Sequence, residues 1–211
     1  MQRIKICGIT QLEQGRSIAA YGATDLGFIC VAASPRYVSP ENLQTMVPAL
    51  QSQVNCVGVF ADAELDHLVH LTETVGFGSM QLHGQESLAY CQQLRERLPD
   101  REIIKAWRVR SLTDLVVIQS YSPVVDALLL DAYHPQALGG TGHTLDWQSL
   151  IDFQPPIPWL LAGGLHPGNI SIALEQLHPD GIDLSSGVEV SPGLKDLKLV
   201  QDLFAEIRKK T

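Results

Sequence analysis

Short apolar segments recur along the chain in a regular order, and each is followed by an amphipathic stretch. Eight of them have the length and composition of buried strands, with centres about 25 residues apart on average. That distance is the length of one strand, one helix and two loops. The predicted strands are residues 4–8, 25–31, 55–60, 79–83, 103–107, 127–131, 159–162 and 182–185.

Helix-start signals follow several of these strands. Thr10 and Glu13 have the spacing of a capping box, and Ser39 precedes a proline at the first helical position. Asp62 and Ser111 are further candidate caps. A last helix is expected over residues 194–210, where it would close the fold.

The alternation of strands and helices predicts parallel strands, because each return crossover then uses a helix. Eight such units in 211 residues predict an α/β fold, a single-domain (β/α)8 TIM barrel over residues 1–211. An open doubly wound sheet would usually have fewer strands and a glycine-rich turn after the first one. An antiparallel sheet is the alternative for strands with one polar face, and the intervening helices argue against it.

Within five strands apolar residues alternate with polar ones, which assigns the two faces of the barrel. One apolar face is predicted to lie under the helices, with Ile4 and Ile6 in the first strand and Ile104 and Ala106 in the fifth. The other face points to the barrel centre, and such folds keep their active sites at the C-terminal ends of the strands. The side chains predicted to meet there are Lys5, Cys7, Gln81, His83, Lys105, Asp131, Asp183 and Ser185.

Composition narrows the class of protein. Hydrophobic residues make up 45% of the chain and charged residues 18%, as in globular proteins with a large core. The net charge of −8 opposes binding to nucleic acid, and no apolar run reaches the roughly 18 residues of a membrane helix. The first residues lack the apolar region of a secretory signal. We therefore expect a soluble cytoplasmic protein that binds neither nucleic acid nor membranes.

We expect neither a metal site nor a disulfide framework, and no cofactor. His67 and His70 lie three residues apart on a predicted helix, without a third metal ligand nearby. Four cysteines lie far apart in the chain and fit reduced thiols. They are Cys7, Cys30, Cys56 and Cys91.

Glycines gather after the last three predicted strands. Because glycine lets backbone N–H groups approach an anion closely, and barrels commonly bind phosphate at this end, these turns predict a phosphate site. Backbone donors also reconcile an acidic protein with an anionic ligand. The predicted phosphate-binding residues are Gly140, Gly142, Gly163, Gly164 and Gly187.

The same segments, taken together and in order, resemble one enzyme family, phosphoribosylanthranilate isomerase of tryptophan biosynthesis. The similarity runs along nearly the whole chain, and the order of the segments makes it specific. The segments are KICGIT at 5–10, SPRYVSPE at 34–41, VGVF at 57–60, QLHG at 81–84, LLLD at 128–131, GGTG at 139–142, LAGGLHPGN at 161–169, and DLSSGVE with PGLKD within 183–196.

The resemblance implies an Amadori rearrangement, the third step of tryptophan biosynthesis from chorismate. N-(5'-phosphoribosyl)anthranilate would open its furanose ring and become 1-(2-carboxyphenylamino)-1-deoxyribulose 5-phosphate. The family pattern implies Cys7 as the general base and Asp131 as the general acid. It also implies Arg36 at the anthranilate carboxylate, Asp183 at a ribosyl hydroxyl and His83 as a hydrogen-bonding residue. Such a protein would act on a small phosphorylated substrate, as a monomer or a homodimer.

These roles carry expectations about protonation. A free cysteine is mostly protonated at neutral pH, so we expect the site to lower the pKa of Cys7, with Lys5 as the source of positive charge. Asp131 needs the opposite shift, toward the protonated form. Cys30 and the run 31–33 depart from the family, which more often has an aromatic residue and a longer polar loop there.

Other phosphosugar barrels are the nearest alternatives. Ribulose-phosphate epimerases are expected to use a metal with paired acids, and the barrel that forms indole-glycerol phosphate a lysine with glutamates. Neither set fits Cys7 with Asp131. A bifunctional isomerase that also converts the histidine-pathway aminoaldose is expected to have an aspartate in place of Cys7. From another class, a non-catalytic barrel that binds a phosphorylated metabolite has no need for an acid and a base across one cavity.

Overall fold

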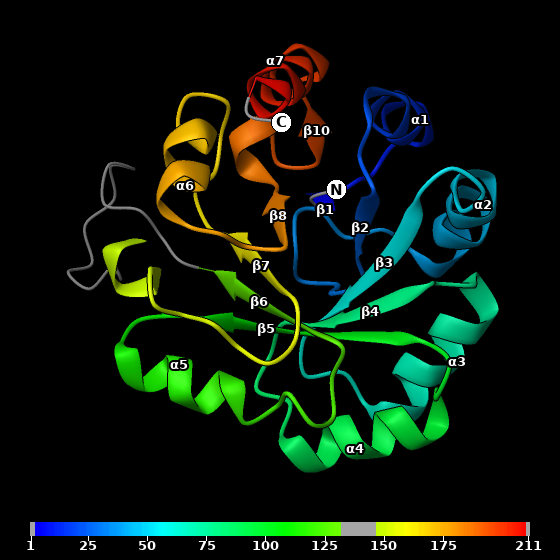
Figure 1. The fold of residues 1–211 in the computed structure, drawn as a ribbon. Coiled ribbons are helices and arrows are strands. Elements are labelled where there is room, and N and C mark those ends of the chain that lie inside the picture. Colours follow the sequence, from blue (N-terminus) through cyan, green and yellow to red (C-terminus); the bar gives the residue numbers. More distant parts are fainter. Residues whose placement is uncertain (1–2, 132–146, 210–211) are drawn as a thin grey trace.

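Eight parallel strands close into a barrel in chain order, in a computed structural model that describes residues 3–131 and 147–209. Figure 1 shows the strands at the centre with the helices around them. All eight predicted strands are confirmed, with ends that differ by at most two residues. They are β1 (Arg3–Cys7), β2 (Asp25–Ile29), β3 (Asn55–Phe60), β4 (Ser79–Leu82), β5 (Glu102–Arg108), β6 (Ala127–Asp131), β7 (Trp159–Ala162) and β8 (Gly181–Leu184).

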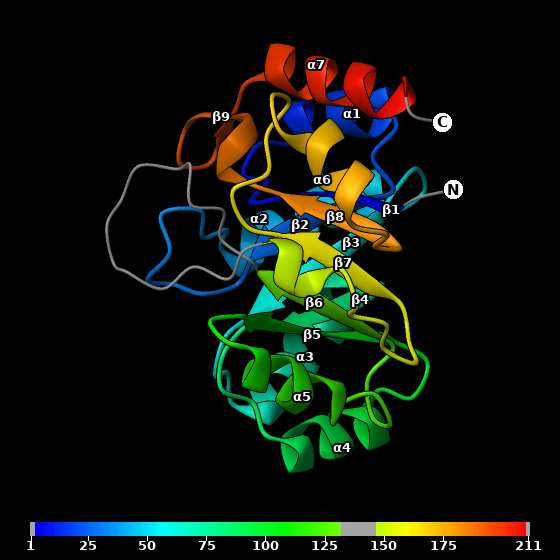
Figure 2. The same cartoon turned by 60° about the vertical axis from the view of Figure 1, so that its left-hand side comes forward.

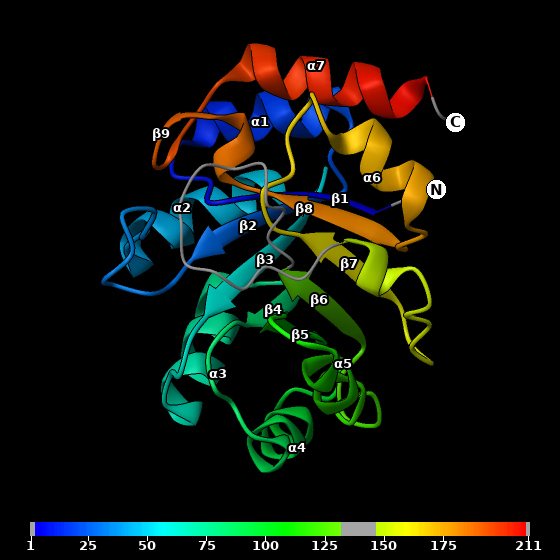
Figure 3. The ribbon, with the colours of Figure 1, turned by 90° about the vertical axis from the view of Figure 1, so that its left-hand side faces the viewer.

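The outer layer consists of helices that bury one apolar face against the strands. Figures 2 and 3 show α7 lying along α1, which closes the ring between the two ends of the chain. The α-helices are α1 (Leu12–Tyr21), α2 (Pro40–Leu50), α3 (Leu65–Val75), α4 (Leu88–Arg97), α5 (Leu112–Gln119), α6 (Ile170–Gln176) and α7 (Leu197–Arg208). None of the helices in the described parts of the chain has the length and apolar character needed to span a bilayer.

Two 3-10 turns and a hairpin complete the described chain. The turns are η1 (Trp147–Leu150) before β7 and η2 (Ser186–Val188) after β8. The short strands β9 (Glu189–Ser191) and β10 (Leu194–Lys195) pair antiparallel. The last helix therefore begins at Leu197 and not at residue 194, because Asp196 caps it by accepting hydrogen bonds from the N–H groups of Lys198 and Leu199.

The predicted helix caps are confirmed where no residue distant in the sequence competes for the capping side chain. Ser39 caps α2, with Pro40 at the first position, and Ser111 stands at the start of α5. The predicted capping box at Thr10 was wrong, because the Thr10 hydroxyl donates a hydrogen bond to the carbonyl of Gly193 at 2.6 Å instead. The prediction that Asp62 caps a helix was also wrong, because its side chain accepts a hydrogen bond from the N–H of Gln85 at 2.6 Å.

The two sides of the strands bury separate apolar clusters. The larger cluster lies between strands and helices, and a smaller one fills the barrel interior with Val57, Ile104, Ala106, Ala127, Leu129, Leu160 and Ala162. The assignment of faces in β5 was therefore wrong. Ile104 is paired with the inward-facing Gln81 and points inward, so Lys105 points outward. There its Nζ lies 2.8 Å from Glu86 Oε2, and this partner explains how a lysine is buried outside the barrel centre.

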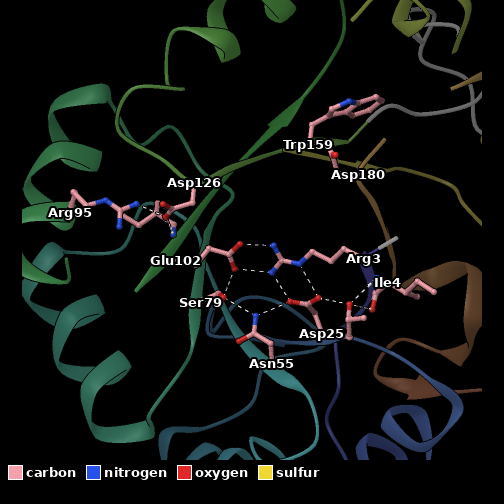
Figure 4. A network of polar contacts seen from close by, with 12 residues as sticks. Arg3, Ile4, Asp25, Asn55, Ser79, Arg95, Glu102, Asp126, Trp159 and Asp180 are labelled. Carbon is pink, nitrogen blue, oxygen red and sulfur yellow. Dashed lines mark hydrogen bonds and ion pairs between the residues drawn. The ribbon is translucent and has the colours of Figure 1, made fainter. Parts of the chain in front are cut away.

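An ion-pair network closes the N-terminal end of the barrel. Arg3 on β1 binds Asp25 on β2 and Glu102 on β5, with guanidinium to carboxylate distances of 2.5 to 2.9 Å. Asn55 donates to Asp25 at 2.7 Å and to Ser79 at 2.8 Å. Figure 4 shows these side chains lying across the strand starts. This end is filled by charged partners, and the cavity described next lies at the other end.

Candidate active site

A cavity of about 240 Å³ opens at the C-terminal ends of the barrel strands. Its wall brings together residues from seven of the eight barrel strands, β5 excepted, and from loops that include the turns after β7 and β8. Eight of the ten predicted site residues line it, namely Cys7, Arg36, His83, Asp131, Gly163, Gly164, Asp183 and Gly187. The remaining two, Gly140 and Gly142, lie outside the described residues. Gln81 and Ser185 from the predicted centre also line the cavity.

Cys7 ends β1 and is buried at the cavity wall. Its neighbour on β2 is Gly27, where a side chain would put Cβ only 2.6 Å from Cys7 Sγ and 3.0 Å from Lys5 Nζ. Glycine at position 27 is therefore what lets the thiol and the ammonium group share this space. Gly8 follows with φ of +79°, a left-handed conformation that turns the chain away from the strand.

The pKa of Cys7 does not shift as expected. Burial raises the pKa of the thiol, and the charge of Lys5 lowers it only in part, since the carboxylate of Asp183 acts in the opposite sense. Lys5 Nζ lies 2.9 Å from Asp183 Oδ1, and both side chains are buried. The expectation that the free protein lowers this pKa was wrong, because Lys5 has its own counter-ion.

Asp131 ends β6 between two cationic or polar neighbours. Its Oδ2 lies 3.8 Å from His83 Nε2 and 3.7 Å from Arg108 Nε. Burial raises the pKa of Asp131, but the hydrogen bond and charge of His83 and the charge of Arg108 outweigh it, so the pKa lies below its usual value. The expected upward shift was wrong for the free protein. The cause is that the two neighbours stabilise the carboxylate form.

His83 is oriented by Gln81 from the same strand end. Gln81 Nε2 lies 3.0 Å from His83 Nδ1. This contact leaves the other ring nitrogen, Nε2, facing Asp131 Oδ2 at 3.8 Å. Gln81 is 1% exposed, and its Oε1 has no hydrogen-bond partner within the described chain.

Glycine turns form the wall on the β7 and β8 side. Gly163 and Gly164 have φ of +94° and +64°, which turns the chain sharply after β7. A Cβ at Gly187 would lie 1.9 Å from the carbonyl oxygen of Leu165, so only glycine lets the two turns meet this closely. Such turns present backbone N–H groups to an anion.

The described residues hold no group of three or more histidine, cysteine or acidic side chains placed to bind a metal ion. The cavity instead combines a thiol, a carboxylate, a histidine, an arginine and glycine turns. This set is suited to moving protons on an anionic substrate.

Comparison with known proteins decides the family. A family model described as N-(5'phosphoribosyl)anthranilate (PRA) isomerase matches residues 4–206. The chain belongs to the phosphoribosylanthranilate isomerase family. The N-(5'-phosphoribosyl)anthranilate isomerase of Microcystis aeruginosa is 56% identical over 207 residues, which cover 98% of each chain.

Solved structures of phosphoribosylanthranilate isomerases have the same fold. The enzyme from Thermotoga maritima superposes with a TM-score of 0.88 at 33% identity, covering 99% of this chain and 100% of that one. Another, in complex with reduced 1-(o-carboxyphenylamino)-1-deoxyribulose 5-phosphate, has a TM-score of 0.87 at 31% identity, again over 99% and 100% of the chains. The predicted barrel and the family resemblance are both confirmed.

Two buried charged residues of this isomerase-family chain were missed in the sequence. Glu189 and Lys195 lie within the DLSSGVE and PGLKD segments, but no role was assigned to either. Glu189 binds the guanidinium of Arg36, and Lys195 donates to the backbone carbonyl of Cys7. The signal available was a charged residue within each family segment, and Lys195 was instead placed in the last helix.

Proposed function

We propose that this protein is an N-(5'-phosphoribosyl)anthranilate isomerase in which Cys7 is the general base and Asp131 the general acid. The observation that carries the proposal is that both side chains line one cavity, from β1 and β6, together with the glycine turns after β7 and β8. An acid and a base on the same cavity beside an anion site is the arrangement that an Amadori rearrangement needs.

The first step opens the sugar. Asp131 donates a proton to the furanose ring oxygen, the bond from that oxygen to C1' breaks, and the anthranilate nitrogen supplies the electron pair for a C1'=N double bond. The product is an open-chain Schiff base with a new hydroxyl at C4'. Asp131 is left as a carboxylate, which the neighbouring His83 and Arg108 stabilise.

The second step moves a hydrogen from C2'. Cys7 as thiolate takes the C2' proton, and the electrons form a C1'=C2' double bond while the nitrogen regains its pair. The resulting enolamine becomes the ketone when the C2' hydroxyl loses its proton and C1' gains one. Atoms and electrons balance, so no redox cofactor is required for the isomerisation.

The remaining cavity residues bind the substrate in this proposal. Gly163, Gly164 and Gly187 would bind the phosphate through backbone N–H groups, a donor set that suits an acidic protein. Arg36 would meet the anthranilate carboxylate, which its planar fork fits. Asp183, held by Lys5 at 2.9 Å, would accept from a ribosyl hydroxyl. The substrate is a small phosphorylated molecule, and we propose that the enzyme works as a monomer or a homodimer.

Loss of substrate fluorescence tests the proposal. Phosphoribosylanthranilate is generated in situ, and wild type is compared with Cys7→Ser and Asp131→Asn in metal-free buffer. We expect each substitution to lower kcat by about 100-fold or more, the size of a lost general acid or base. Full activity of both variants would leave the isomerase activity standing and reject the proposed roles of Cys7 and Asp131. A folded wild-type protein without activity would overturn the proposal that the protein is this isomerase.

A further inference from the structure

Arg36 is held at the cavity wall by a glutamate from a distant part of the chain. Arg36 Nε lies 2.9 Å from Glu189 Oε1, and Nη2 lies 2.6 Å from Oε2, so the guanidinium and the carboxylate meet fork to fork. The Arg36 side chain also covers Gly8, where an added Cβ would lie 2.6 Å from Arg36 Cδ. The guanidinium therefore has one fixed place next to the residue that follows the proposed base.

One nitrogen of this guanidinium remains free for a ligand. The three hydrogen bonds to Glu189 use Nε and Nη2, and Nη1 makes none within residues 3–131 and 147–209. Arg36 lines the cavity, and its side chain is 22% exposed while that of Glu189 is 3% exposed. Glu189 thus binds one edge of the fork and leaves Nη1 without a partner in the described chain, on a side chain that lines the cavity.

Lys195 extends this pair to Cys7. Its Nζ lies 2.8 Å from Glu189 Oε1, 2.5 Å from the carbonyl oxygen of Cys7 and 3.3 Å from that of Ser185. The ammonium group has three protons, and these three acceptors use them all. Because a buried lysine loses its side-chain freedom and its hydration, such a complete set of partners indicates a fixed geometry.

Charge counting separates this cluster from the other buried ion pair at the site. Lys5 and Asp183 carry +1 and −1, and their sum is zero. Arg36, Glu189 and Lys195 carry +1, −1 and +1, and their sum is +1. Burial lowers the pKa of Lys195, and the charge and hydrogen bond of Glu189 oppose that shift. The cluster therefore carries a net positive charge next to the cavity, on the side where Arg36 meets it.

We propose that Glu189 and Lys195 are positioning residues for the isomerisation. Glu189 fixes the Arg36 guanidinium for a substrate carboxylate, and Lys195 ties that pair to the backbone of Cys7 and supplies positive charge near its thiol. The inference rests on the proposed function, since it assigns Arg36 and Cys7 their roles. Within the cluster, Glu189 acts on substrate binding and Lys195 acts on the base.

The two roles predict different kinetic changes. Glu189→Gln removes the negative charge that orients Arg36, so we expect KM to rise about tenfold while kcat stays within about twofold. Lys195→Met removes a positive charge near Cys7 and leaves Arg36 paired with Glu189. We therefore expect kcat to fall about tenfold with little change in KM. The double variant should show both changes.

Glu102→Gln is the matched control. Glu102 binds Arg3 fork to fork at the opposite end of the barrel, with distances of 2.5 and 2.8 Å. It loses the same charge from the same type of pair, so it reports the general effect of weakening such a pair. We expect its KM and kcat to match wild type. Urea unfolding of each variant shows that it is folded under assay conditions.

Binding and alkylation supply readouts that do not need turnover. Calorimetry with reduced 1-(o-carboxyphenylamino)-1-deoxyribulose 5-phosphate should show about tenfold weaker binding to Glu189→Gln, while inorganic phosphate binds as to wild type. The titratable groups that interact with the Cys7 thiol are Lys5, Cys30, Arg36, Asp183 and Lys195. The pH midpoint of Cys7 alkylation by iodoacetamide should move upward in Lys195→Met, as measured by mass spectrometry of its peptide.

Each outcome decides between the roles. Equal loss of analogue and phosphate binding in Glu189→Gln would overturn its role in orienting Arg36. An unchanged alkylation midpoint with unchanged kcat in Lys195→Met would overturn the link to Cys7. If wild type lacks isomerase activity, the proposed function fails, yet the binding and alkylation results still decide the inference.

Discussion

Lys5 Nζ lies 2.9 Å from Asp183 Oδ1 inside the barrel, in the same space as the thiol of Cys7. The lysine that a sequence-based argument selects as the activator of Cys7 is thus neutralised by its own partner. The pKa of Cys7 is raised by burial, with Lys5 lowering it and Asp183 raising it. The pair therefore adds two opposed charges to the effect of burial on the thiol pKa.

Substitution of each partner should move the Cys7 pKa in opposite directions. Lys5→Met leaves the Asp183 carboxylate beside the thiol, so we expect the pKa of Cys7 to rise further. Asp183→Asn leaves the Lys5 ammonium, so we expect it to fall. Alkylation of the Cys7 peptide by iodoacetamide against pH measures both. Because breaking a buried pair costs about 3–5 kcal/mol, circular dichroism must show that each variant is folded. Shifts of the same sign would contradict the prediction.

The acid and the base have pKa shifts that point away from their proposed roles. The pKa of Cys7 is raised and that of Asp131 is lowered in the free protein. At neutral pH most molecules then carry a thiol and a carboxylate, and the reactive minority carries a thiolate and a carboxylic acid. In this situation the lower limb of the pH profile of kcat/KM belongs to the acid, and the upper limb to the base.

Arg108→Met should raise activity at the plateau of that profile. It removes a positive charge 3.7 Å from Asp131, so the carboxyl pKa rises and the lower limb moves to higher pH. Each pKa unit gained should increase the reactive fraction about tenfold. The profile of kcat/KM from about pH 3 to 10, read at the plateau and at the lower limb, tests this, with Arg110→Met as the control for loss of an exposed arginine nearby. A lower plateau with the limb unmoved would show that Arg108 serves the substrate instead.

Much of this site could be predicted because it depends on strand periodicity. Cys7, Asp131 and Asp183 share the inward face by alternation alone, and parallel strands bring their C-terminal ends together. Lys105 does not follow this alternation, because Glu86 neutralises its charge on the outer face of the barrel. Alternation alone therefore does not decide which face a lysine takes, because an ion pair can bury it on either one, Lys5 with Asp183 inside the barrel and Lys105 with Glu86 outside it.

The rest depends on partners that are distant in the sequence. Thr10 is satisfied by Gly193, and Arg36 by Glu189, contacts that no local pattern encodes. Lys195 falls within the helix expected over residues 194–210, yet the hairpin of β9 and β10 brings its ammonium group to the carbonyl of Cys7. Tertiary hydrogen bonds override local preferences at these positions.

Gly187→Ala should weaken phosphate binding. Its Cβ would lie 1.9 Å from the carbonyl oxygen of Leu165 and 2.9 Å from the carbonyl carbon, so the turn after β8 must move. We expect the affinity for inorganic phosphate to fall about tenfold or more, because the backbone donors lose their alignment. Calorimetric titration with phosphate measures the change.

Gly76→Ala provides the control for that experiment. Gly76 ends α3 with φ of +83°, and its nearest neighbour would be Gln51 Oε1 at 3.5 Å from the added Cβ. The strained conformation should lower the free energy of unfolding by about 1–2 kcal/mol without affecting phosphate affinity. Equal phosphate affinity of Gly187→Ala and Gly76→Ala would show that Gly187 is not part of the phosphate site.

The network around Arg3 should make stability depend on pH through Asp25. Burial raises the pKa of Asp25, but the hydrogen bonds and charge of Arg3 outweigh it, so the folded-state pKa lies below the usual value. A depressed carboxyl pKa stabilises the folded protein above the unfolded-state pKa of about 3.9. This stabilisation is lost as the pH falls through the folded-state pKa.

Asp25→Asn removes the titrating group and should lower the free energy of unfolding at pH 7 by about 2–3 kcal/mol, the size of lost hydrogen bonds to a charged group. Below pH 4 the carboxyl of wild type becomes protonated, so the difference between the two proteins should shrink. Urea unfolding at pH 7, 5, 4 and 3 measures it. Because this network lies at the end of the barrel opposite Cys7, kcat should not change. A constant difference at every pH would mean that Asp25 stabilises the barrel through packing and not through its charge.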